Sequence, residues 1–211
     1  MRHFGVYTQV LTDDSDPEHS LEIAVIPPRL EHDYYTLVTL GLSRHRMGFP
    51  EERREEKLER AELLINLPRD WKLTKADCRA ERWSWPIRMM LATAHFAMED
   101  PEVGLESRTT LMADEEGVPL SEDTDLRGEI LLYPGVFGTD SFFCRLPDGD
   151  EVNFYQVIPL YRDELEYKLA HDADALLDKM EGISFVVEPD RQDAITRGTL
   201  SNDDFDGEMD D

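Results

Sequence analysis

The sequence predicts an α+β fold, a mixed and mainly antiparallel β-sheet packed with helices. Three observations predict it. Short runs of β-branched and aromatic residues are separated by prolines, glycines and polar loops, a pattern typical of strands joined by turns. Two longer segments instead repeat apolar residues every three or four positions, which indicates amphipathic helices. The stretch 151–180 joins both patterns, because a strand runs through Pro159 into a helix.

The first half of the chain supplies the first expected strands. We expect them at residues 6–11, 21–26 and 34–42, paired antiparallel. Residues 51–60 mix five acidic with four basic side chains, which is typical of an exposed connecting helix or a solvated loop. The apolar run 61–67 follows this charged segment.

Pro68 ends that apolar run, and the turn after it should direct Trp71 inward. Further on, Pro86 is well placed to start a helix, because proline is favoured in a first helical turn. His95 falls beside the apolar face of this helix, where a lone histidine is more often a packing residue than a ligand. The residues that share the face are Ile87, Met90, Leu91, Ala94 and Met98.

The second half repeats the pattern. We expect strands at 108–112 and 126–133, separated by a loop. Residues 142–158 should form a hairpin, because Asp148 and Gly149 make a dipeptide that favours a tight turn.

Pro159 should then end strand pairing and begin one long helix. Its apolar face comprises Leu165, Leu169, Ala173, Leu176, Leu177 and Met180, and its solvated face carries Arg162, Glu164, Glu166 and Lys168. Gly182 should close this helix, and 183–187 should form a last strand.

Length and charge limit the function. The 211 residues suit one domain, expected at 1–198, followed by an acidic tail at 199–211 that we expect to be disordered. A net charge of −25 repels phosphate backbones, which argues against direct nucleic-acid binding. Such acidity can attract a basic protein partner, but solubility, adaptation to high salt or genome composition would also produce it.

No motif points to chemistry. Cys78 and Cys144 are isolated, so they form neither a disulfide framework nor a zinc site, and they fit a reducing compartment. The sequence lacks a signal-peptide pattern and any apolar segment long enough to span a membrane, so we expect a cytoplasmic protein. No nucleophile elbow or phosphate-binding loop occurs. The residues alone therefore predict no catalytic, cofactor or metal site, and they do not identify a partner-binding site or an oligomeric state.

Four stretches in order resemble the Suppressor of Fused domain family in its bacterial single-domain form. They are LEIAVIPPRLEHDYYTLVTLGLSRHRM, AELLINLPRDWKL, WPIRMMLATAHFA and VNFYQVIPLYRDELEYKL. The chain departs from the family where many members carry Gly-His-Thr, because Ser107, Arg108 and Thr109 stand there and the histidine is absent. We also expect the helical N-terminal segment common in relatives to be missing.

The resemblance implies a non-enzymatic interaction module without a cofactor. Animal members bind a transcription factor, and bacterial members look like immunity proteins that neutralise toxins, often nucleases. We therefore expect an immunity protein that binds a basic toxin domain. The alternatives are a regulatory or scaffold protein with a transcription factor or another non-toxin partner, and an unrecognised metal-dependent hydrolase.

The resemblance also indicates which residues should fix the fold and which regions should bind a partner. Its best-matching residues, Trp71, Trp85, Pro86 and Pro159, should fix the fold, because core residues of this type normally report packing. The binding surface should lie on loops such as 100–125 or on acidic patches.

Overall fold

The computed structural model describes residues 3–13, 20–100, 102–112 and 117–197. The predicted acidic tail at 199–211 lies outside them. The described residues form an eight-stranded sheet in the order β1-β2-β3-β4-β8-β6-β5, with β7 paired to β8 beside this path. The strands are β1 (Gln9–Thr12), β2 (Glu22–Ile26), β3 (Tyr34–Leu40), β4 (Ala61–Pro68), β5 (Thr110–Met112), β6 (Gly128–Leu132), β7 (Phe143–Arg145) and β8 (Glu151–Leu160).

The pairing confirms the predicted mixed, mainly antiparallel sheet. All neighbours run antiparallel except the central pair β4 and β8, which is parallel with Leu63 opposite Tyr155. Central strands covered on both faces read as continuous apolar runs rather than alternating ones. The run at 61–67 is of this kind, and every residue in it is buried.

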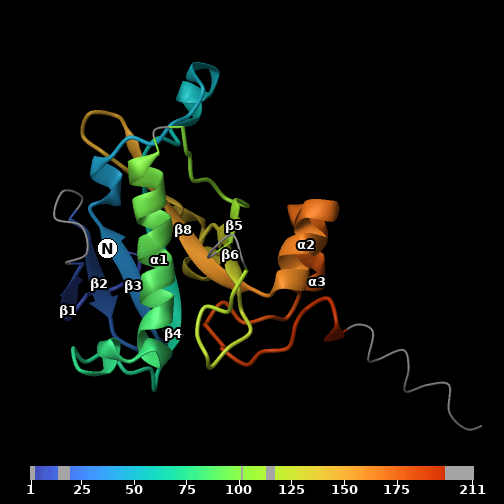
Figure 1. Ribbon diagram of the computed structural model, residues 1–211. Coiled ribbons are helices and arrows are strands. Elements are labelled where there is room, and N and C mark those ends of the chain that lie inside the picture. Colours follow the sequence, from blue (N-terminus) through green and yellow to red (C-terminus); the bar gives the residue numbers. More distant parts are fainter. Residues whose placement is uncertain (1–2, 14–19, 101, 113–116, 198–211) are drawn as a thin grey trace, which may run out of the picture.

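Helices cover both faces of the sheet (Figure 1). They are α1 (Glu81–Glu99), α2 (Arg162–Ala170) and α3 (Ala173–Lys179). The helix α1 packs Met90 and Ala94 onto Leu131 and Val157 in the main core. The helices α2 and α3 form a second core on the opposite face, whose buried members include Ile130, Leu132, Ile158, Leu160, Leu165, Leu176 and Met180. The sheet edge formed by β6 and β5 therefore has a helical layer on each side.

The predicted strands at 21–26 and 34–42 and the hairpin at 142–158 are confirmed with small shifts of their ends. The turn residue Gly149 has a φ of 89°. Such a left-handed backbone is open to glycine at little steric cost, which explains its place in the turn. The first strand starts only at Gln9 rather than at residue 6.

Pro159 does not end strand pairing, contrary to the prediction. It lies inside β8 and pairs with Glu129 of β6. The pairing of β8 with its parallel neighbour β4 has already ended, since the last pair joins Leu64 to Gln156. On that side β8 needs no backbone donor, so a proline is tolerated there.

The single long helix predicted after Pro159 is also wrong. The chain breaks between α2 and α3, and the Asp172 side chain accepts a 2.8 Å hydrogen bond from the Ala175 N–H. An aspartate in this capping position starts a new helix because it satisfies a free backbone donor. Leu169, placed on the apolar face by its spacing, is instead 72% exposed.

Two further boundaries differ from expectation. The helix α1 starts at Glu81, so Pro86 lies inside it rather than in its first turn. Residues 183–187 form no full strand, because only Val186 makes a bridge, to Asn66 of β4. The Gln156 side chain donates to the Phe185 carbonyl at 2.7 Å, which holds this segment without strand pairing.

Candidate partner-binding site

The segment 100–125, where the sequence placed the binding surface as an alternative to the acidic patches, contains the edge strand β5, and its described residues contribute to two grooves. The α1 groove lies between α1 and residues 111–112 and 118–120, over the floor formed by β6, with a volume of about 530 Å³. The α3 groove lies on the other face, between residues 106–108, the end of β6 and the segment 177–185, with a volume of about 670 Å³. The edge of the sheet therefore has an open groove on each side.

One face of α1 forms the first wall of the α1 groove. Its lining residues recur at helical spacing and are Glu81, Trp85, Arg88, Met89, Ala92, Thr93 and Phe96. The facing wall consists of Leu111, Met112, Val118, Pro119 and Leu120. Phe96, Met112 and Val118 are each nearly half exposed, at 45%, 47% and 46%. Exposed apolar side chains gathered at one groove are typical of interaction sites.

The floor of the α1 groove carries a buried acid, Glu129. The Thr93 hydroxyl donates to its Oε1 atom, whereas Oε2 has no partner within the described residues. Burial raises the pKa of Glu129 to about 8, only partly offset by the Thr93 hydrogen bond. The charged residues that line the groove besides it, Glu81 and Arg88, pair with each other at 3.0 Å. The groove thus offers one carboxyl group among apolar walls.

The α3 groove contains two residues of the Ser107–Thr109 tripeptide singled out in the sequence. Ser107 and Arg108 line it, together with apolar residues that include Met180 and Phe185. Arg108 has a φ of 78°, which is uncommon for a residue other than glycine, and its guanidinium contacts Asp174 of α3 at 2.6 Å. This tripeptide therefore places a paired cation at the rim of the groove.

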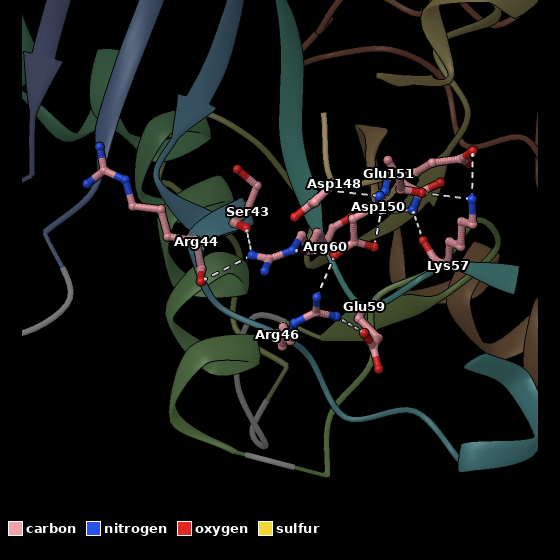
Figure 2. A network of polar contacts seen from close by, with 11 residues as sticks. Ser43, Arg44, Arg46, Lys57, Glu59, Arg60, Asp148, Asp150 and Glu151 are labelled. Atoms are coloured by element: carbon pink, nitrogen blue, oxygen red, sulfur yellow. Dashed lines mark hydrogen bonds and ion pairs between the residues drawn. The ribbon is translucent and has the colours of Figure 1, made fainter. Parts of the chain in front are cut away.

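A separate polar network lies at the β7–β8 turn, away from both grooves (Figure 2). Asp150 accepts from Arg60 Nε at 2.9 Å and from Arg46 Nη2 at 2.6 Å. These arginines, Arg60 first, lower the pKa of Asp150. Arg60 also donates to the Ser43 carbonyl at 2.6 Å, which ties the loop after β3 to the hairpin. Because its charges are mutually satisfied, we interpret this network as structural.

The framework residues predicted from the sequence lie in the core. Trp85 is 1% and Trp71 7% exposed, and the Trp71 indole N–H donates to the Trp83 carbonyl at 3.0 Å. His95 contacts the Asp13 carboxylate at 2.6 Å, which agrees with a packing role. Among the described residues no cluster of three or more His, Cys, Asp or Glu side chains could hold a metal ion.

Sequence reasoning missed Glu129. The available signal was a single acid within the apolar run GEILLY, at a position where the neighbouring residues predict a buried strand. An ionisable residue inside such a run is either paired or functional, because burying a charge alone is costly.

The comparisons with known proteins identify the family. The family model described as Suppressor of fused protein (SUFU) matches residues 17–192. This chain belongs to the SUFU family. The resemblance found in the sequence is therefore confirmed over most of its length. No curated protein matches the chain in sequence.

Solved SUFU structures share the fold. A SUFU homologue from Neisseria gonorrhoeae FA 1090 matches with a TM-score of 0.61 and 16% identity, over 88% of this chain and 86% of that one. The Sufu–Fu complex matches with a TM-score of 0.60 and 14% identity, over 96% and 91%. Drosophila Suppressor of Fused matches with a TM-score of 0.55 and 18% identity, over 88% of this chain but 46% of its own length.

In the part of the chain that the structure covers, no helix is long and apolar enough to cross a membrane.

Proposed function

We propose that this SUFU-family chain is a non-enzymatic immunity protein that neutralises a basic toxin domain by binding it through the surface around β5. The observation that carries the proposal is the pair of apolar grooves beside this edge, in a chain of net charge −25. Proteins of the family are typically protein-binding or regulatory modules. One solved relative is itself a complex, that of Sufu with Fu.

The two physical features have different roles in binding. Apolar side chains such as Phe96 in the α1 groove and Phe185 in the α3 groove provide area that a partner can bury. The net negative charge attracts a basic surface and speeds its encounter, an effect that salt screens. A nuclease toxin fits this chemistry, because it presents a basic surface to its polyanionic substrate.

The test is a pull-down with the tagged protein against toxin domains encoded near it, at low and at high salt, combined with a killing assay. We expect capture of a basic toxin domain, weaker capture at high salt and loss of killing. Capture of a regulatory protein alone, with no toxin protected against, would favour the scaffold function instead.

A matched pair of variants locates the surface. Phe96→Ser removes an exposed aromatic side chain from the α1 groove, and Phe143→Ser removes a similarly exposed one, at 40%, from β7 outside both grooves. Because buried aromatic residues carry much of the energy of protein interfaces, Phe96→Ser should weaken toxin binding at least about tenfold, which is roughly 1.4 kcal/mol. Phe143→Ser should leave it unchanged, and the reverse order would contradict the proposed surface.

A further inference from the structure

The floor of the α1 groove combines two features that seldom occur together without a ligand. Glu129 is only 2% exposed, and its Oε2 atom lacks a hydrogen-bond partner among the described residues, although Glu129 is one of the residues that line an open groove. A buried polar atom without a partner is costly and requires an explanation. The groove above it has room for a side chain, at about 530 Å³.

We propose that the α1 groove receives one cationic side chain of the partner protein, whose head group donates to Oε2 of Glu129. This inference deepens the proposed function and relies on it for the source of the cation. Both parts of an arginine or lysine side chain fit the groove. The aliphatic stem can pack on the apolar walls, and the charged head group needs an acceptor, which Glu129 supplies. Trp85, Met89 and Leu111 supply such walls.

The charges around the groove favour a cation. Among the described residues, the other charged side chains that line the groove are Glu81 and Arg88 of α1, and these two pair with each other at 3.0 Å. The remaining lining residues, from α1, β5, 118–120 and β6, carry no ionisable side chain. Within the part of the groove that the structure describes, Glu129 therefore meets no unpaired cation, and the net negative charge of the chain attracts basic surfaces.

Binding of a cation is coupled to loss of the Glu129 proton. Burial raises the pKa of this carboxyl to about 8, so most molecules are neutral at pH 7. The ionised fraction, which accepts the cation, rises about tenfold between pH 7 and pH 9 for a pKa of this value. A cation that stays charged over this range, such as a guanidinium, should bind about tenfold more tightly at pH 9.

A side-chain analogue tests this without the natural partner. We would titrate the full chain with n-butylguanidinium and with n-butanol, following the ¹³C carboxyl signal of Glu129 by NMR. The inference predicts that n-butylguanidinium binds at least tenfold more tightly than n-butanol, lowers the pKa of Glu129, and gains about tenfold in affinity from pH 7 to pH 9. Equal binding of the two probes would overturn it. An affinity for n-butylguanidinium that falls as the pH rises would also overturn it, because the ionised carboxylate of Glu129 would then not be the acceptor.

Two variants complete the test. Glu129→Gln keeps the size of the side chain and an acceptor for Thr93, and should lose at least tenfold of the n-butylguanidinium affinity together with its pH dependence. Glu166→Gln, on the exposed face of α2 and outside both grooves, is the control and should bind n-butylguanidinium as the wild type does. The NMR titration of the wild type decides the inference even if Glu129→Gln folds poorly. Toxin capture without any n-butylguanidinium binding would overturn this inference alone, whereas probe binding without a toxin partner would contradict only the proposed function.

Discussion

Glu164 of α2 forms a buried ion pair with Arg191, which holds the chain around Arg191 against this helix. The closest contact joins Arg191 Nη2 to Glu164 Oε2 at 2.5 Å. The Arg191 side chain is 8% exposed and the Glu164 side chain is 0% exposed. Glu164 also accepts the backbone N–H groups of Tyr161 and Ala194, at 2.9 and 2.8 Å. We predict that Glu164→Gln destabilises the protein strongly, because the guanidinium then stays buried without its counter-charge.

The magnitude follows from burial. Removing one partner of a buried ion pair costs about 3–5 kcal/mol, whereas an exposed pair contributes about 0–1 kcal/mol. The same helix offers the control, since Arg162 and Glu166 pair at 2.8 Å with side chains that are 58% and 61% exposed. Glu166→Gln should therefore cost less than about 1 kcal/mol of the free energy of unfolding.

Urea denaturation followed by tryptophan fluorescence measures both variants. The expected result is a difference of several kcal/mol between Glu164→Gln and Glu166→Gln, with part of the loss recovered when Arg191→Met is added to Glu164→Gln. If both single variants unfolded within 1 kcal/mol of each other, roughly the range of a surface pair, the reasoning from burial would be refuted.

Three further outcomes are expected. Gly128→Ala should cost about 1–3 kcal/mol in urea denaturation, because its Cβ would lie 2.4 Å from a carbonyl oxygen of β5, whereas Gly135→Ala has no atom within 4 Å and should change stability little. Glu129 has a pKa raised from 4.5 to about 8, so its contribution to stability is full below pH 4.5 and falls as the pH rises to 8. Relative to Glu129→Gln, the wild type should lose up to about 1.4 kcal/mol per pH unit over that window, and a constant difference between the two unfolding curves would contradict this. Ser43→Ala removes a hydroxyl that donates to the buried Glu62 at 2.7 Å, so thermal unfolding should show a loss of about 1–3 kcal/mol; an unchanged melting temperature would argue against this contact.

Local patterns predicted the sheet better than the helices. The strand at 21–26 and the hairpin turn at Asp148–Gly149 depend on neighbours within a few residues, so the sequence carries them directly. Pro159 shows the limit of such reasoning. Its tolerance depends on where the pairing of β8 with β4 ends, and β4 lies about ninety residues earlier in the chain.

The error at Glu164 has the same origin. Its spacing placed it on a solvated helix face, together with Arg162, Glu166 and Lys168. The structure buries it against Arg191, which comes 27 residues later. Helical periodicity distinguishes the faces of one helix but does not show which face another segment will cover.

The candidate site was predictable only as a region. The segment 100–125 was expected to carry the binding surface, and it does line both grooves, but whether a partner binds there stays a prediction. The acid at the floor, Glu129, comes from β6, and Thr93, which contacts it, comes from α1. Their meeting depends on how α1 crosses the sheet, and no local pattern contains that information.

The most direct test of the proposed binding surface is hydrogen–deuterium exchange of the full chain with and without a captured toxin domain. The proposal predicts that exchange slows in α1 and around β5, on the side of the two grooves. Slowing confined to β1 and β2, at the opposite edge of the sheet, would contradict it, because the partner would then bind where neither groove lies.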